Sequence, residues 1–270
     1  VDASPHAKQE HIGSSQMGRP MRMVTVTDSR FDDEDKHRVW IHSRAHAGEV
    51  TSTHNMIGIL EQITEESELG RRLRQNCIFN IVPLENVDGV WAGHTRWDMQ
   101  GEDPERDWCD PVLPAVQAIK TKVDGFLAGP NPIELALNLH STKGNFTDTF
   151  FFKHLYPSVS RDFEVIQQNY IDAFANATPL FDNRSPHSSQ LTQCGNFSGA
   201  YIESYFWQEG GESVMALTHE GHFYRRITDN GFITGEDYRT LGRAQAEALV
   251  EYFSLPPAEP EPKAPAWRLY

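Results

Sequence analysis

The feature that most constrains the fold is an alternation between short apolar runs and longer stretches in which apolar residues recur at helical spacing. Apolar runs of strand length lie at Val39–His42, Cys77–Pro83, Leu135–Leu139 and Val214–Thr218. Between the first two, Glu49–Ile63 carries apolar residues at three- and four-residue intervals, which indicates an amphipathic helix. Strands that alternate with helices pair in parallel by crossing over through those helices. We therefore predict one doubly wound α/β domain, with a mixed, mostly parallel central sheet flanked by helices.

The remaining patterns extend this domain along most of the chain. They predict two more strands, at Met21–Thr27 and Thr149–Phe152, and three more helices, at Asp110–Lys122, Phe163–Ala177 and Gly235–Phe253. Beyond the last helix the composition shifts to LPPAEPEPKAP, which is typical of an extended, semi-rigid segment. We predict that residues 1–254 form the domain and that residues 255–270 form a Pro-rich tail.

The charge balance restricts the class of partner. The chain has 38 acidic against 24 Lys and Arg residues, a formal net charge of -14. Nucleic acids and anionic membranes need a basic surface, so both are excluded as partners, and no apolar run approaches the ~18 residues that span a bilayer. Peptides and small molecules remain, and the oligomeric state stays open. The three cysteines are too few and too scattered for a disulfide framework, which slightly favours the cytoplasm over an otherwise open localisation.

Polar side chains cluster in sequence at the ends of three predicted strands. His46 and Glu49 follow the strand Val39–His42, His140 follows Leu139, and Glu220 follows Thr218 by two positions. Ligands of an open parallel sheet bind outside the carboxyl ends of its strands, so these side chains are expected to converge on one crevice. A catalytic zinc ion takes three protein ligands, and two His with one Glu form an established set. Glu220 is then the candidate general base.

Each of these residues also has an ordinary explanation when taken alone. An HxxE pair such as His46 and Glu49 arises by chance in a chain with 12 His. An isolated His140 is most often a core histidine, and Glu220 an ordinary strand-end acid. Only their joint placement at neighbouring strand ends favours a metal site.

The same residues fall within a series of motifs in a fixed order. These are HSRAHAGE at 42–49, PLENVDGV at 83–90, GHTR at 93–96, GEDPERDW at 101–108, LHS at 139–141 and THE at 218–220. From about residue 12 to residue 253 the chain resembles the zinc metallocarboxypeptidases. It is most similar to the branch that contains the cytosolic carboxypeptidases and their bacterial relatives. The resemblance implies a metallocarboxypeptidase-like domain that hydrolyses a C-terminal peptide or amide bond.

The resemblance also implies roles for individual residues. His46, Glu49 and His140 fall on the ligand positions for one Zn2+ ion. Glu220 falls on the carboxylate that activates water, and Arg96 on the arginine that polarises the scissile carbonyl. Arg106 falls on the arginine that pairs with the terminal carboxylate of the substrate. Tyr201 and Tyr205 lie in the region of the tyrosine that caps the substrate.

One departure from the family pattern concerns specificity. Glu105 stands where the family usually has Asn, beside the carboxylate-binding Arg106. An anionic neighbour either weakens the grip of Arg106 on a free carboxylate or itself binds an amine of the substrate. We assign Glu105 to substrate binding and expect a basic or amino-bearing group near the C-terminus of the substrate, as in a cell-wall peptide that contains diaminopimelate. The segment 194–200 has no Arg or Lys where deglutamylating relatives place a basic residue, which argues against glutamate trimming.

Two other functions remain open at this level. An amidohydrolase with the same zinc site would cleave small acylated amino acids, as aspartoacylase-like relatives do. A non-catalytic descendant would bind a peptide or a partner without turning it over. Arg106 in its Trp-bearing motif favours peptide cleavage over the first, and the presence of both Glu220 and Arg96 counts against the second.

Overall fold

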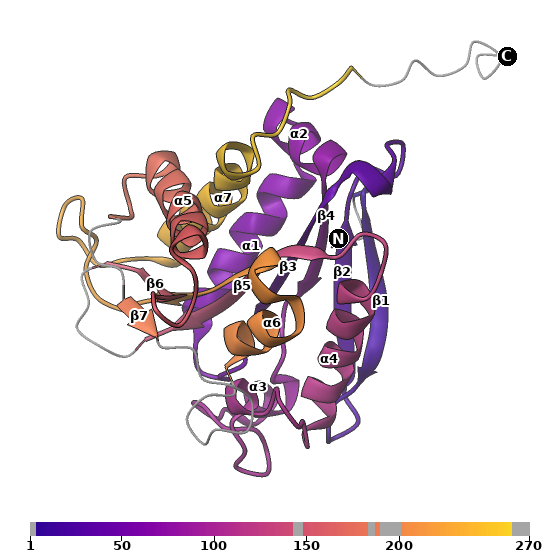
Figure 1. Cartoon of the computed structure of the whole chain (residues 1–270). Helices are drawn as coiled ribbons and strands as arrows, with labels where there is room; N and C mark the ends of the chain where they lie inside the picture. The colour runs from indigo at the N-terminus through magenta and orange to yellow at the C-terminus, as the bar shows by residue number, and fades with distance from the viewer. Residues whose placement is uncertain (1–3, 143–147, 183–186, 190–200, 261–270) are drawn as a thin grey trace, which may run out of the picture.

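A computed structural model describes residues 4–142, 148–182, 187–189 and 201–260 (Figure 1). Its described strands form one eight-stranded sheet in the order β1-β2-β4-β3-β5-β8-β6-β7. The strands, in sheet order, are β1 Ala7–Ser14, β2 Pro20–Val26, β4 Cys77–Val82, β3 His37–Ser43, β5 Ile133–Ser141, β8 Met215–Gly221, β6 Phe150–His154 and β7 His187–Ser189.

The centre of the sheet is parallel and its flanks are mixed. β4, β3, β5 and β8 run parallel to one another, and β6 runs parallel to β7. The pairs β1–β2, β2–β4 and β6–β8 are antiparallel. The prediction of a mixed, mostly parallel sheet in a doubly wound α/β domain is confirmed.

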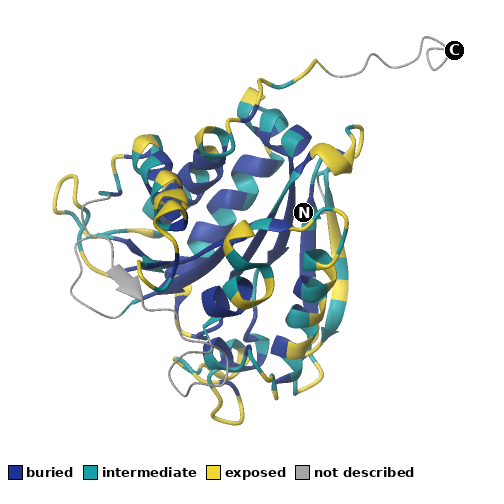
Figure 2. Cartoon of the chain, in the orientation of Figure 1, coloured by how far each residue is buried: buried dark blue, intermediate teal, exposed yellow. Residues whose placement is uncertain are grey.

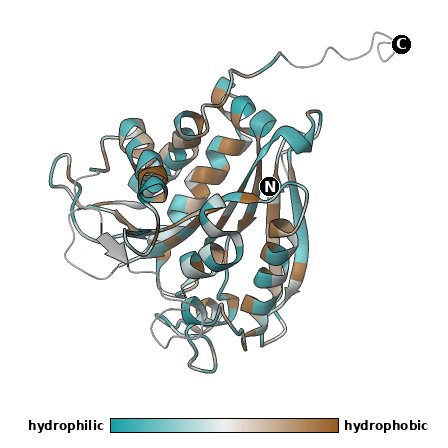
Figure 3. Ribbon diagram, viewed as in Figure 1, coloured by the Kyte–Doolittle hydropathy of each residue, from teal (hydrophilic) through white to brown (hydrophobic). Residues whose placement is uncertain are grey.

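Helices cover both faces of this sheet (Figure 1). They are α1 Val50–Thr64, α2 Glu68–Asn76, α3 Val87–Ala92, α4 Pro114–Leu127, α5 Arg161–Ala177, α6 Ile202–Gly210 and α7 Gly235–Tyr252, with short 3-10 turns at Asp33–Asp35, Pro104–Arg106 and Gly211–Ser213. The buried residues of α1, α5 and α7 share one apolar cluster with the sheet, and those of α4 and α6 share a second cluster. The two clusters define the two layers of helices. The central strands β3, β4 and β5 are almost wholly buried (Figure 2), and the ribbon coloured by hydropathy shows hydrophobic residues in this part of the sheet (Figure 3).

The close packing of α1 against α7 fixes the helix that begins next to the site. A Cβ added to Gly58 would lie 2.0 Å from the carbonyl oxygen of Arg239, and one added to Gly242 would lie 2.0 Å from that of Asn55. The two helix backbones are therefore in direct contact, with a glycine on each side. Because α1 starts immediately after Glu49, this contact anchors one end of the predicted metal site.

Several boundaries differ from the sequence predictions. The expected helix at Asp110–Lys122 begins at Pro114, since proline suits the first turn of a helix. β5 and β8 extend beyond their predicted ends to Ser141 and Gly221, so His140 and Glu220 lie within strands rather than after them. Strands β1 and β7 and helices α2, α3 and α6 were not predicted.

The start of the Pro-rich segment packs against the domain. Leu255 is buried, and Arg72 Nε donates a hydrogen bond to the carbonyl oxygen of Pro256 at 2.8 Å. The boundary after residue 254 remains a prediction, and residues 261–270 lie outside the described residues. No helix in the described part of the chain is long and apolar enough to cross a bilayer.

Candidate metal centre and active site

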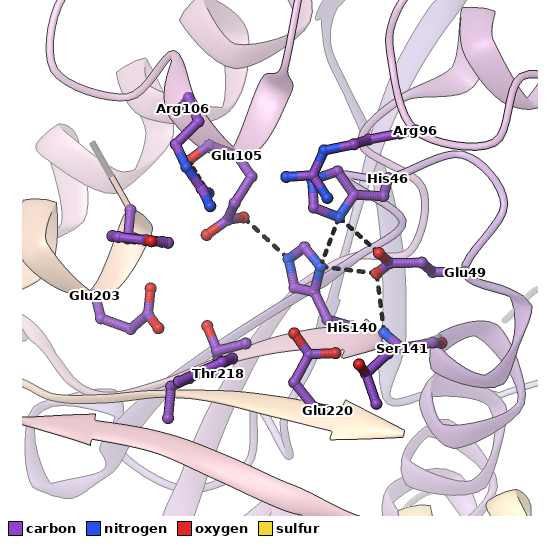
Figure 4. Close-up of a pocket in the computed structure, with 13 residues that line it drawn as sticks. His46, Glu49, Arg96, Glu105, Arg106, His140, Ser141, Glu203, Thr218 and Glu220 are labelled. Carbon is purple, nitrogen blue, oxygen red and sulfur yellow. Dashed lines mark hydrogen bonds and ion pairs between the residues drawn. The ribbon is translucent and has the colours of Figure 1, made fainter. Parts of the chain in front are cut away.

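The three predicted ligands meet at the carboxyl ends of β3 and β5 (Figure 4). His46 and Glu49 come from the loop between β3 and α1, and His140 comes from β5. Glu49 Oε1 lies 2.6 Å from His46 Nδ1, and Glu49 Oε2 lies 2.7 Å from His140 Nδ1. The two Nδ1 atoms are 3.1 Å apart. One ligand atom from each residue thus faces the same small volume.

Local backbone geometry holds the loop that carries His46 and Glu49. Arg44 adopts a φ of 62°, which reverses the chain after β3. Its guanidinium donates to the carbonyl oxygen of Ala47 and, at 2.8 Å, to Thr53 Oγ1. Gly48 N donates to the carbonyl oxygen of Thr95 at 2.8 Å, and a Cβ on Gly48 would lie 2.8 Å from that oxygen. Only glycine fits there, so this approach sets the metal loop beside Arg96.

The cluster fits one divalent ion by its donor set and its spacing. Bonds of 2.0–2.1 Å in a tetrahedral site put ligand atoms about 3.3 Å apart, close to the separation of the two Nδ1 atoms. The ligand atoms of all three residues lie within 4.8 Å of one another. Ser141 N donates to Glu49 Oε2 at 2.9 Å, which fixes the orientation of the carboxylate. Two imidazoles and a carboxylate are a set that zinc accepts, with a position left for water.

Two further carboxylates contact the Nε2 atoms of the histidine rings, opposite the Nδ1 atoms that face the metal site. His46 Nε2 lies 3.0 Å from Asp103 Oδ1, and His140 Nε2 lies 3.0 Å from Glu105 Oε2. Asn138 Nδ2 donates to both oxygens of Glu105, at 3.1 and 3.0 Å. A carboxylate in this position places the ring proton on Nε2 and leaves Nδ1 free to bind metal. Sequence reasoning missed Asp103, although it stands in the GEDPERDW motif.

We expect Glu105→Gln to lower zinc affinity by roughly 10- to 100-fold, the usual cost of losing such a carboxylate. The amide keeps the shape of the side chain but removes the charge that supports His140. Competition with a chelating dye would measure the affinity. Glu102→Gln, on an exposed residue of the same loop, is the matched control. Equal affinities for the two variants would contradict this role.

A cavity of about 290 Å³ opens beside the cluster. Its lining residues are His46, Glu49, Arg96, Glu105, Arg106, His140, Ser141, Thr142, Phe152, Tyr201, Glu203, Thr218 and Glu220. The structure therefore brings the predicted ligands together with Glu220, Arg96, Arg106, Glu105 and Tyr201.

Glu220 reaches the cavity from β8, in register with His140 on β5. Burial is the main cause that raises the pKa of its carboxyl group to about 7. Its Oε2 atom is buried and has no hydrogen-bond partner among the described residues. A carboxylate that exchanges its proton near neutral pH is suited to general acid–base catalysis.

The two arginines lie in different surroundings. Arg96 donates from Nε and Nη2 to Asp103 Oδ2, at 3.0 and 2.7 Å. Arg106 stacks its guanidinium 3.9 Å from the centre of the Tyr201 ring and donates from Nη1 to the carbonyl oxygen of Glu105 at 3.5 Å, but it forms no ion pair with a described carboxylate. Its planar fork is therefore available to a carboxylate from outside the chain.

The placement of the two tyrosines separates them. Tyr201 lines the cavity and supports Arg106. Tyr205 is 2% exposed, donates its hydroxyl to Asp124 and packs against Trp108 at 5.7 Å between ring centres. This placement corrects the expectation for Tyr205, which is a core residue. It does not line the cavity.

Two of the three cysteines lie among the described residues. Cys77 is free and buried in β4, and Cys109 is disulfide-bonded. A single bond is not the framework of several bridges that the small number of cysteines excludes.

The fold and the site together define a class. An α/β sheet that carries two His and one Glu at the carboxyl ends of its central strands, with a further Glu beside them, has the arrangement of a zinc hydrolase. The zinc carboxypeptidase family model matches residues 2–233, and the chain belongs to this family.

Curated relatives and solved structures agree with this assignment. Cytosolic carboxypeptidase 6 of Mus musculus is 24% identical over 92% of this chain and 46% of its own length. The Homo sapiens protein of the same name is 24% identical over 97% of this chain and 52% of its own length. The chain therefore spans about half the length of these relatives. A metallo-carboxypeptidase from Burkholderia cenocepacia superposes with a TM-score of 0.81 at 23% identity, over 94% of this chain and 66% of that one.

Proposed function

We propose that this chain is a zinc-dependent metallocarboxypeptidase, which hydrolyses the C-terminal peptide or amide bond of a peptide substrate with water. The observation that carries the proposal is the convergence of three kinds of group on one cavity. These are the cluster of His46, Glu49 and His140, the acid Glu220, whose Oε2 has no partner among the described residues, and the guanidinium of Arg106, which pairs with no described carboxylate.

The residues divide the reaction among them. Zinc held by the cluster would polarise the carbonyl and lower the pKa of water. Arg106 binds the terminal carboxylate and sets the scissile bond in the cavity. Arg96 stabilises negative charge that develops on the carbonyl oxygen. Glu220 accepts the proton of the attacking water and returns it to the leaving amine.

The alternatives differ in what they need from the cavity. The substrate of an amidohydrolase for small acylated amino acids also carries a free carboxylate, so Arg106 would serve either enzyme, and the family match favours the peptidase. A non-catalytic binder has no use for a buried carboxylate such as that of Glu220, whose Oε2 atom has no partner among the described residues, because that arrangement costs stability. The family match and Glu220 therefore favour peptide hydrolysis.

The compartment is a separate question. The shared name of the matched relatives supports a cytoplasmic location.

The proposal is tested with two peptides that differ only in a free or an amidated C-terminus. The zinc-loaded protein should release the last residue of the free peptide and leave the amide largely intact. A chelator should abolish release, and added zinc should restore it. Mass spectrometry identifies the product. Cleavage inside the peptide, or release that survives removal of zinc, would overturn the proposal.

A further inference from the structure

Glu203 is a buried acid in the cavity to which the sequence motifs gave no role. It lies in the first turn of α6, two residues after Tyr201, and is 4% exposed. Its Oε2 atom is buried and has no hydrogen-bond partner among the described residues. Burial, with Glu105 nearby, raises the pKa of Glu203 to about 7. A buried carboxylate in this condition is stabilised by a cation.

The other acids of the cavity are already engaged. Glu49 faces both imidazoles and accepts from Ser141 N, and Glu105 faces His140 and accepts from Asn138. Glu220 also lines the cavity and is assigned to the proposed proton transfer. Asp103, which is not among the lining residues, pairs with Arg96. Among the described acids that line the cavity, Glu203 is therefore the one with neither a cationic partner nor a catalytic role.

The position of Glu203 changes which acid is expected to set specificity, from Glu105 to Glu203. The sequence suggested Glu105 as the acid that meets an amine on the substrate. The structure instead directs the Glu105 carboxylate to His140 Nε2, at 3.0 Å. Apart from Glu220, the acid among the described cavity residues with an oxygen that lacks a partner is Glu203.

We propose that Glu203 binds the cationic side chain of the leaving residue, so that the substrate ends in an amino- or guanidino-bearing residue. This inference rests on the proposed function and names its substrate class. Tyr201 in the same turn stacks on Arg106, which couples the carboxylate anchor to α6. Figure 4 shows Arg106, Glu105 and Glu203 on the side of the cavity away from Glu49, with Thr218 between Glu203 and His140.

The arrangement selects against other leaving residues for a physical reason. A leaving residue that places its carboxylate on Arg106 can extend its side chain toward Glu203. An ammonium or guanidinium there would pair with the Glu203 oxygen that has no partner among the described residues. A neutral side chain of equal length would leave the buried acid unpaired, and an acidic one would add like charge.

The test uses peptides that differ only in the last residue, which is lysine, norleucine or glutamate. We expect the zinc-loaded protein to prefer lysine over norleucine by roughly 100-fold in kcat/KM, and glutamate to be the poorest. In Glu203→Gln the ratio of lysine to norleucine should fall to near one. Glu209→Gln, at an exposed position of the same helix, should keep the wild-type ratio. The ratio compares two substrates on one enzyme, so partial loss of folded protein does not alter it.

The outcomes separate this inference from the proposed function. If the peptides are cleaved but the wild-type protein shows no preference for lysine, or Glu203→Gln keeps the preference, Glu203 does not set specificity. If no peptide is cleaved, the proposed function fails, and calorimetry with free L-lysine and L-norleucine still tests the site. Tighter binding of lysine to the wild-type protein, lost in Glu203→Gln, supports the cation site. Equal binding of the two amino acids overturns it.

Discussion

Glu220→Gln should reduce peptide turnover about a thousandfold while zinc remains bound. The substitution keeps the size of the side chain but removes its capacity to accept and return a proton. Zinc should stay because the contacts of its three ligands do not include Glu220. Steady-state kinetics on a peptide with a free C-terminus, together with elemental analysis of zinc, measures both quantities.

The variant also removes a buried ionisable group, so its fold must be checked. Circular dichroism and thermal unfolding should show a folded protein at least as stable as the wild type, because an amide costs less to bury than a carboxylate. Glu247→Gln, at an exposed position on α7, provides the control and should retain full turnover. A protein that acts as a peptide binder would show no change in peptide affinity and no turnover in either form. Retained turnover in Glu220→Gln would assign the proton transfer to another group.

The fold could be predicted because its signal is repeated along the chain. The apolar runs at Val39–His42, Cys77–Pro83 and Leu135–Leu139 became the parallel strands β3, β4 and β5. Strand β1 was missed because it lies at the edge of the sheet, where many of its side chains face solvent and lack an apolar pattern. Short helices such as α3 were missed because six residues are too few to establish a period.

Only the site residues that follow or end predicted strands could be predicted from the sequence. His46, Glu49 and His140 were found because a parallel sheet brings the ends of neighbouring strands together. Asp103 and Glu105 owe their positions to a short 3-10 turn, and the direction of such side chains has no signature in sequence. Glu203 could have been suspected because it lies among the apolar and aromatic residues that begin helix α6. Its open oxygen becomes evident only from the three-dimensional packing.

Replacing Arg106 by Met should reduce kcat/KM for a peptide with a free C-terminus by roughly 100- to 1,000-fold. Methionine keeps an unbranched side chain that can still contact the Tyr201 ring but has no charge. The loss should appear mainly in KM if the arginine binds substrate and transition state equally, and in kcat if it mainly aligns the scissile bond. Arg106→Lys should recover part of the loss, because an ammonium supplies charge without the planar pair of donors.

The amidated peptide makes this prediction specific to the carboxylate. Amidation of the peptide and the substitution Arg106→Met each remove the ion pair between the terminal carboxylate and Arg106, the first from the substrate and the second from the protein. The two changes should therefore not add, and Arg106→Met should hydrolyse the free and amidated peptides at similar low rates. Arg96→Met is the matched comparison, because it removes a cavity arginine assigned to the carbonyl oxygen. It should slow both peptides while preserving the wild-type ratio between them. If Arg106→Met preserved that ratio as well, the terminal carboxylate would have to be bound elsewhere, and the orientation of substrate proposed for this cavity would be wrong.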